Sequence, residues 1–462
     1  MHKIRRRAFI VVALVLALCA GLTFYIVSYA SDGGTWVSLP SNRHLYKNGQ
    51  LVLGTITDRD GTVLARTVNG ERRYAADGTV RRAMLHLVGD TQGRIGTGVQ
   101  TKFSGELSGF SPISGLFFAE QNGGTLALSA DAAIAKAAYE ALGGYNGAVI
   151  AYNYKTGAIL CAVSKPGFDP ENVPAGLESD PAYAGAYVNR CFRAAYTPGS
   201  TMKLVTTAAA LETVPDILDR TFTCDGSVVI DGRRINCQNV HGEIGLEEAL
   251  AKSCNCAFAE IAQLVGGKTL AEYFSRCGLD AAFDIDGIRT AAGGIGVWDD
   301  GSAELSWAGI GQSTDLATPA ALMRLCGAVA NGGVAVQPHL LLDSRSPSER
   351  LLSAPTAQKL AELMRNDTQT VYGDASFPAE LEGLVCAKSG TAQLDGAASH
   401  SWFVGFAAGD RYPVAFAVIA EHAGAGSGVA RDLPPGWRTL PPLVPFQGIG
   451  KRSRPVLPTL DP

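Results

Sequence analysis

The hydrophobic pattern begins with an apolar run from Ala8 to Ala30 that contains no charged residue. As a helix this run measures about 35 Å, enough to cross a hydrocarbon layer of about 30 Å. The basic residues 1–7 precede it, which predicts a single-pass anchor over 8–30, a cytoplasmic tail over 1–7 and an extracytoplasmic remainder. A cleaved signal peptide is the alternative, because Ser28 and Ala30 form a small-x-small pair, but the run exceeds the usual signal length.

Beyond the anchor the pattern changes twice. Residues 31–50 are polar and predict a linker. Residues 51–66 hold two β-like runs around Asp60-Gly61, which predicts a hairpin. Short β-like runs and glycine-rich turns continue, so we expect a small β-rich or α+β domain of the pedestal or dimerisation type over 51–125.

A larger unit is predicted from residue 126 onwards. Asp131–Leu142 has a helical pattern that ends at Gly143-Gly144, and a mainly helical region follows later in the chain. Strand patterns lie on both sides of that helical region, over 147–153, 157–163, 384–393, 401–407 and 412–421. We therefore expect one α+β domain over 126–431, whose sheet joins both parts of the chain.

Composition excludes several classes of protein. Hydrophobic residues make up 47% of the chain and charged residues 18%, which suits a large core and excludes disorder or coiled coil for the whole chain. The net charge of −4 argues against a nucleic-acid partner. The mean hydropathy of +0.11 is high for a soluble enzyme and agrees with an anchor. Residues 432–462 are proline-rich and predict a non-helical tail.

The cysteines show no regular spacing, so they do not predict a disulfide scaffold. Cys254 and Cys256 are one residue apart without a histidine close by, and we expect no metal site and no cofactor. An Asp-Gly turn at 231–232 would bring Cys224 and Cys237 close together, and a disulfide between them is one possibility.

The candidate nucleophile is Ser200. It follows Pro198-Gly199 at the expected start of a helix, and Lys203 lies three residues later on the same face. A serine hydroxyl needs a base to become a nucleophile, and a desolvated lysine can serve as that base. The helix N-terminus also places backbone N–H groups where a negative oxygen would develop.

Two further elements follow in chain order. Ser253-Cys254-Asn255 offers a hydroxyl that can relay a proton and an amide that can bind a substrate carbonyl. Lys388-Ser389-Gly390 begins a late strand, where Lys388 could meet a carboxylate, Gly390 would allow close approach and Thr391 could donate to an oxyanion. A second copy of this last pattern, 155–157, lies between two predicted strands and is interpreted as an ordinary hairpin turn.

These three elements in this order resemble the penicillin-binding protein and serine β-lactamase superfamily. Within it, the segments 54–65, 147–173, 309–334 and 400–407 are similar to class B penicillin-binding proteins, and the resemblance covers about residues 50–424. The resemblance implies a five-stranded antiparallel sheet flanked by helices, a small N-terminal domain and a membrane anchor. The chain departs from the family pattern at DLPPGWRTLPPLVPF, which cannot form the usual C-terminal helix and puts stability in question.

The resemblance also implies a role for each matching residue. Ser200 would attack the D-Ala-D-Ala end of a peptidoglycan stem peptide, with Lys203 as the base. Ser253 would relay a proton, Asn255 would hold the peptide amide, and the N–H groups of Ser200 and Thr391 would form the oxyanion hole. Lys388 and Thr391 would bind the terminal carboxylate, and Ser389 and Gly390 would be further substrate-binding residues. β-Lactams, membrane lipid and a membrane glycosyltransferase of the shape, elongation, division and sporulation type are the other expected partners.

Other functions are weaker alternatives. A D,D-carboxypeptidase would differ only in using water as the acceptor. A class A β-lactamase would need a Glu-x-x-Leu-Asn segment to activate water, and none follows Ser253. A β-lactam sensor or a division scaffold would be non-enzymatic, whereas the three intact motifs favour a D,D-transpeptidase.

Overall fold

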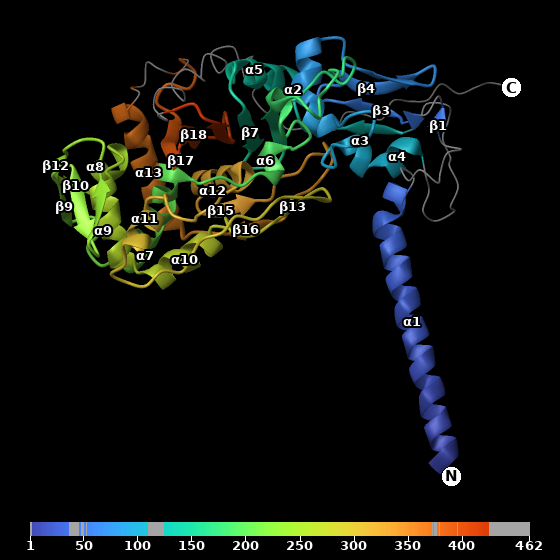
Figure 1. Cartoon of the computed structure of the whole chain (residues 1–462), viewed down its shortest axis with the longest axis horizontal. Helices are drawn as coiled ribbons and strands as arrows, with labels where there is room; N and C mark the ends of the chain where they lie inside the picture. Colours follow the sequence, from blue (N-terminus) through green and yellow to red (C-terminus); the bar gives the residue numbers. More distant parts are fainter. Residues whose placement is uncertain are drawn as a thin grey trace.

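The computed structural model describes residues 2–36, 46–47, 50–51, 53–109, 124–371, 373, 377, 379–394 and 396–424. Its first element is the long helix α1 (His2–Trp36), which projects away from the body of the molecule (Figure 1). The stretch Arg5–Ser28 is long and apolar enough to cross a membrane. The helix continues past Ala30 into the predicted linker, while most of the remaining linker and the predicted tail, 432–462, lie outside the described residues.

A four-stranded sheet follows the helix, in the order β5-β4-β3-β6. The predicted hairpin at Asp60-Gly61 is present, and Asp58 closes it by accepting the N–H groups of Asp60 and Thr62. The strands and helices of this region are β3 (Thr55–Thr57), β4 (Val63–Val68), β5 (Glu71–Tyr74), β6 (Thr125–Ala127), α2 (Gly78–Val88), α3 (Val99–Lys102) and α4 (Ser104–Ser108). The short strands β1 (Tyr46–Lys47) and β2 (Gln50–Leu51) precede it. Strand β6 spans the boundary predicted between residues 125 and 126 and pairs with β3 in this sheet.

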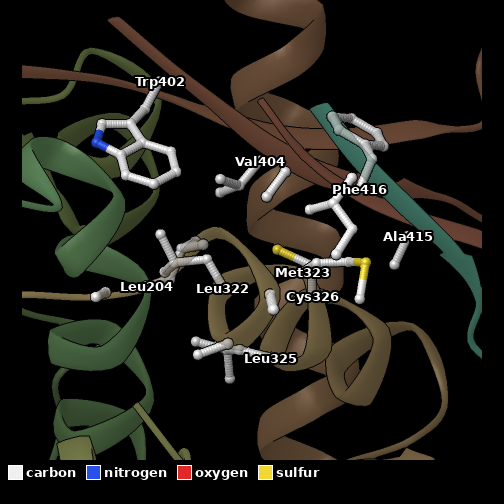
Figure 2. Close-up of a cluster of buried hydrophobic side chains, with 14 of the residues drawn as sticks. Leu204, Leu322, Met323, Leu325, Cys326, Trp402, Val404, Ala415 and Phe416 are labelled. Atoms are coloured by element: carbon white, nitrogen blue, oxygen red, sulfur yellow. The ribbon is translucent and has the colours of Figure 1, made fainter. Parts of the chain in front are cut away.

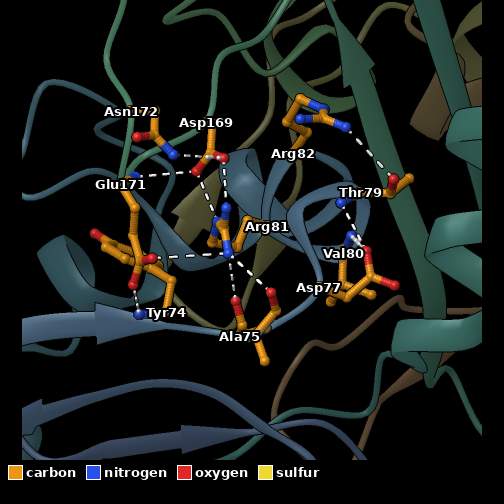
Figure 3. Close-up of polar contacts among 11 residues, drawn as sticks. Tyr74, Ala75, Asp77, Thr79, Val80, Arg81, Arg82, Asp169, Glu171 and Asn172 are labelled. Carbon is orange, nitrogen blue, oxygen red and sulfur yellow. Dashed lines mark hydrogen bonds and ion pairs between the residues drawn. The ribbon is translucent and has the colours of Figure 1, made fainter.

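Helix α2 joins this region to the rest of the chain. It packs against α5 (Ala132–Ala141) and β8 (Ile159–Lys165), and one continuous apolar core includes residues from both sides. Figure 3 shows the polar part of this contact, in which Arg81 of α2 binds Asp169 with two nitrogens, at 2.7 Å and 2.6 Å. Glu171 lies 3.7 Å from the same guanidinium. The N-terminal region therefore contacts the larger domain through both apolar packing and ion pairs.

The larger domain is built on a five-stranded sheet of order β17-β18-β19-β7-β8, with every neighbouring pair antiparallel. The remaining strands are β7 (Gly147–Asn153), β17 (Val385–Leu394), β18 (Ala397–Ala407) and β19 (Val414–Ala420). The pairing of β19 with β7 joins the late strands to the early ones, which confirms the predicted α+β fold. Residues 155–157 lie in the turn between β7 and β8, as predicted.

Apolar side chains attach the helices to this sheet. Figure 2 shows Leu322, Met323 and Cys326 of α12 (Pro319–Ala330) against Val404 and Phe416 of the strands. Helix α13 (Ala354–Val371) packs against the edge strand β17. Strands buried on both faces need an apolar residue at almost every position, and β19 reads VAFAVIA for this reason.

A helical lobe lies beside the edge strand (Figure 1). Its elements are α7 (Lys203–Thr213), α8 (Leu246–Ala251), α9 (Asn255–Val265), α10 (Gly267–Arg276), α11 (Ala303–Gly309), β9 (Thr221–Cys224), β10 (Ser227–Ile230), β11 (Arg233–Asn236) and β12 (Gly242–Gly245). The predicted hairpin at 231–232 joins β10 and β11, and β9 pairs with β12. Smaller elements complete the described chain: α6 (Arg190–Arg193), β13 (Asp284–Ile285), β14 (Ile288–Arg289), β15 (Val334–Val336), β16 (Ser348–Arg350) and the 3-10 turns η2 (Pro181–Tyr183) and η3 (Gly199–Met202).

Candidate active site

The predicted nucleophile lies in the tight turn η3, directly before α7. Gly199 has φ 55°, and a Cβ there would meet the carbonyl oxygen of Thr391 at 2.5 Å. Only glycine therefore lets this turn press against β17. Ser200 is half-buried at the same turn, so its backbone and that of Thr391 come from adjoining segments.

Lys203 is fully buried and brings the first two motifs together. Its Nζ lies 3.0 Å from Ser200 Oγ, 3.1 Å from Ser253 Oγ and 2.7 Å from the Ser253 carbonyl oxygen. It also donates to Asn255 Oδ1 at 2.8 Å. Every one of these partners is neutral, and no carboxylate of the described residues lies within ion-pair distance of Lys203.

Burial of Lys203 and, to a smaller extent, the nearby positive charge of Lys388 lower the pKa of its amine from 10.5 to about 7. An amine with this pKa exists partly in its neutral form near neutral pH. It can then accept a proton from a serine hydroxyl 3.0 Å away.

The second motif turns sharply at Ser253, whose φ is 51°. A serine rarely adopts this left-handed conformation, which costs roughly 1–3 kcal/mol and is typical of functional sites. The turn lets both the hydroxyl and the carbonyl of Ser253 face Lys203. Cys254 caps α9, and Asn255 is the first residue of that helix.

The third motif lies on the edge strand β17, where neighbouring side chains point to opposite faces. Ser389 and Thr391 are half-buried on one face, whereas Lys388 and Gly390 are buried on the other. A Cβ at Gly390 would meet Thr201 Cγ2 at 2.9 Å, so this glycine admits the nucleophile turn.

Lys388 is not exposed to a substrate carboxylate in this structure. Its side chain is fully buried, and Nζ lies 2.9 Å from Asp367 Oδ2 of α13, which is also fully buried. A direct contact between Lys388 and a substrate carboxylate would require release from Asp367. Ser389 and Thr391, which flank Gly390, are more accessible than Lys388.

Asp367 was not anticipated from the sequence. It lies on a different element from Lys388 and belongs to no motif. Burial raises its pKa to about 6, while Lys388 opposes that shift. The neighbouring Thr368 accepts the N–H of Ala387 at 2.8 Å, so α13 is held to β17 beside the ion pair.

A second cluster, also missed, lies behind the Ser253-Cys254-Asn255 turn. One ligand atom from each of Cys224, Cys237, His241 and Cys254 lies within 4.8 Å of the others. All ten cysteines are free thiols, so the possible disulfide between Cys224 and Cys237 is not formed. The sequence signal was the spacing Cys-x12-Cys-x3-His-x12-Cys, in which His241 lies far from Cys254 in sequence but close in space.

Taken together, the fold and the site define a serine acyltransferase architecture, with the nucleophile turn between a helical lobe and the edge of an antiparallel sheet. The description "Penicillin binding protein transpeptidase domain" matches residues 147–433, more than half of the chain. The chain therefore belongs to the penicillin-binding protein transpeptidase family, and the resemblance to its class B members is confirmed.

Individual relatives agree with this family. Peptidoglycan D,D-transpeptidase PbpA of Mycobacterium tuberculosis is 28% identical over 342 residues, 66% of this chain and 68% of that protein. PbpA of Mycolicibacterium smegmatis is 26% identical over 492 residues, 95% of this chain and 98% of that protein. The chain is accordingly a transpeptidase of the penicillin-binding protein type.

Solved structures show the same fold. The penicillin G acyl-enzyme complex of penicillin-binding protein A from M. tuberculosis has a TM-score of 0.71 at 24% identity, covering 83% of this chain and 99% of that chain. The D,D-transpeptidase domain of a peptidoglycan glycosyltransferase from Eggerthella lenta has a TM-score of 0.69 at 26% identity, covering 83% and 97%.

Proposed function

We propose that the protein is a membrane-anchored D,D-transpeptidase that cross-links peptidoglycan stem peptides through an acyl-enzyme at Ser200. The observation that carries this proposal is the buried Lys203 amine, 3.0 Å from Ser200 Oγ, with a pKa of about 7. A neutral amine at that distance can take the hydroxyl proton as the serine attacks.

The proposed reaction has two steps. Ser200 Oγ bonds to the carbonyl carbon of the penultimate D-Ala while its proton passes to Lys203. The carbon–nitrogen bond to the terminal D-Ala then breaks, and Ser253 relays a proton to the leaving amine. In the second step an amine of another stem peptide attacks the ester, the ester bond breaks, and Ser200 regains its proton.

The other motif residues would bind the substrate. The Asn255 amide holds the peptide, and the N–H groups of Ser200 and Thr391 stabilise the oxyanion. Ser389 and Thr391, half-buried on the accessible face of β17, receive the terminal carboxylate, and Gly390 allows the strand to lie close to the nucleophile. Lys388 contributes its positive charge from behind the strand.

The apolar helix α1 supports membrane anchoring, and the basic residues before it support an extracytoplasmic catalytic domain. The solved neighbour that carries penicillin G as an acyl-enzyme supports β-lactams as trapping ligands of Ser200. A membrane glycosyltransferase of the shape, elongation, division and sporulation type is the proposed partner that supplies new glycan.

Labelling with a fluorescent penicillin tests the nucleophile. The full chain in detergent should be labelled, Ser200→Ala should not, and Ser179→Ala, an exposed serine outside the site, should behave as the unaltered protein. Equal labelling of Ser200→Ala would refute the assignment. Persistence of the label for hours would exclude a β-lactamase, and cross-linked dimers from lipid-linked substrate would separate a transpeptidase from a carboxypeptidase.

A further inference from the structure

The cluster of Cys224, Cys237, His241 and Cys254 is unexplained by the acyl-transfer reaction. Cys224 ends β9, Cys237 follows β11, and Cys254 caps α9, so three separate elements converge on it. None of the four contacts Ser200, yet Cys254 lies between Ser253 and Asn255, which both contact Lys203.

The spacing of the four ligand atoms matches a tetrahedral metal centre. Zn–S bonds of about 2.3 Å and Zn–N bonds of about 2.0–2.1 Å place tetrahedral sulfur pairs about 3.8 Å apart and sulfur–nitrogen pairs about 3.5 Å apart. Here Cys237 Sγ and Cys254 Sγ are 3.9 Å apart. His241 Nδ1 lies 3.5 Å from Cys224 Sγ and 3.6 Å from Cys237 Sγ.

The surroundings suit thiolates. The backbone N–H of Asn255 points at Cys237 Sγ at 3.3 Å, and that of Ala257 points at Cys254 Sγ at 3.5 Å. Both groups belong to the first turn of α9, an eleven-residue helix whose N-terminus favours negative charge. Such N–H donors commonly orient and stabilise metal-bound sulfur. Cys224 Sγ also lies 3.5 Å from the carbonyl of Asn239, the contact that suits a protonated thiol instead.

We propose that Cys224, Cys237, His241 and Cys254 bind one zinc ion. Three soft sulfur ligands and one imidazole select zinc over the oxygen-binding cations. Four protein ligands leave no open position for water, so the ion has a structural role.

The site would stabilise the second motif from behind. With Cys254 and, through its N–H, Asn255 fixed to the metal centre, the left-handed turn at Ser253 is held facing Lys203. Loss of zinc should therefore slow acylation of Ser200. This last consequence rests on the proposed function, whereas metal binding does not.

Metal analysis of the full chain, purified in detergent with reductant, tests the proposal. We expect about one zinc per chain, as in closed four-ligand sites. Cobalt exchanged into the same protein should show the visible bands of a tetrahedral ion and thiolate-to-cobalt charge transfer. Reduced protein that binds neither metal, or a Cys224–Cys237 disulfide as its resting form, would overturn the proposal.

Variants then assign the ligands. Cys224→Ser and His241→Ala should fall below about a tenth of an equivalent of zinc, because each removes one of four ligands. Cys277→Ser, a buried cysteine outside the cluster, should keep the full equivalent. Retention of zinc by both ligand variants contradicts the site. Penicillin labelling by zinc-depleted protein, before and after zinc is restored, reports the effect on the active site separately from metal binding.

Discussion

Two cations with several polar partners, Arg81 and Lys203, show opposite electrostatic behaviour. Arg81 joins the N-terminal region to the larger domain and binds the carboxylate of Asp169, which raises the pKa of its guanidinium. Lys203 in the active site has neutral oxygens as its hydrogen-bond partners among the described residues, and burial is the main cause that lowers its pKa to about 7. Burial without a carboxylate partner therefore allows the Lys203 amine to lose its proton and act as a base. Arg81 stays charged, as a guanidinium does, and its pairing with Asp169 is structural.

Lys388 lies between these two cases. It is as buried as Lys203 but has a carboxylate partner, Asp367. The positive charge of Lys388 in turn helps to lower the pKa of Lys203. The active site thus combines one buried lysine that is paired with a carboxylate and another whose hydrogen-bond partners are neutral.

Replacing the proposed base should have the largest effect. Lys203→Arg keeps a positive charge but cannot accept a proton near neutral pH, so acylation by a fluorescent penicillin should slow roughly 10²–10⁴-fold. Lys252→Arg is the control. Lys252 is an exposed lysine directly before the second motif, and its replacement should leave the rate unchanged. If Lys203→Arg is acylated as fast as the control, Lys203 is not the base, and it does not differ from Arg81 in this respect.

Removing the carboxylate partner of Lys388 should cost stability. Asp367→Asn leaves a fully buried ammonium without its counter-charge, which should lower the free energy of unfolding by about 3 kcal/mol. Chemical denaturation measures this change, with the exposed Asp410→Asn as control. Adding Lys388→Met should recover part of the loss, because the two residues are coupled. Independent, additive effects would contradict the ion pair.

The Arg81 contact should matter for stability alone. Arg81→Met keeps the apolar stem but leaves the largely buried Asp169 carboxylate without its counter-charge, so the free energy of unfolding should fall by about 2 kcal/mol. Arg73→Met, whose partner Glu71 is exposed, should change stability by less than about 1 kcal/mol. Penicillin labelling should be unchanged in both variants. A slower label for Arg81→Met would link the two regions functionally.

The pH profile of acylation tests Lys203 without a mutation. Because its pKa is lowered to about 7, the neutral amine is scarce below that pH and predominates above it. The acylation rate should therefore rise about tenfold per pH unit below pH 7 and level off above it. A rate that keeps rising towards pH 10, where an ordinary lysine titrates, would contradict the lowered pKa of Lys203.

Asp315 adds a buried acid to the comparison of Arg81, Lys203 and Lys388. It is fully buried, and neither carboxylate oxygen has a hydrogen-bond partner among the described residues. Burial raises its pKa from 3.8 to about 8, so the folded state keeps the proton that the unfolded state loses, and stability should fall as pH rises from about 4 to about 8. Asp315→Asn should flatten this slope and stabilise the protein at pH 8 by about 1 kcal/mol. An unchanged slope in thermal melts would contradict the shift.

Much of the fold follows from local patterns in the sequence. The hairpins at Asp60-Gly61 and 231–232, helix α5 and all five strands of the main sheet lie where periodicity and turn residues predict them. Neighbouring residues interact over short distances, so such patterns are visible without a structure. The pairing of β6 with β3 across the predicted boundary at 125/126 was not predicted, because a pairing between distant segments leaves no local signal.

The candidate site divides in the same way. The sequence by itself determined the long apolar N-terminal helix, the sheet and the order of three motifs that carry Ser200, Lys203, Ser253, Asn255 and Lys388. Only the tertiary structure decided that Lys203 has neutral partners, that Lys388 pairs with Asp367, and that His241 joins three cysteines. Each of these contacts joins residues from separate elements, and burial and charge depend on which surfaces pack together rather than on which residues are adjacent in the chain.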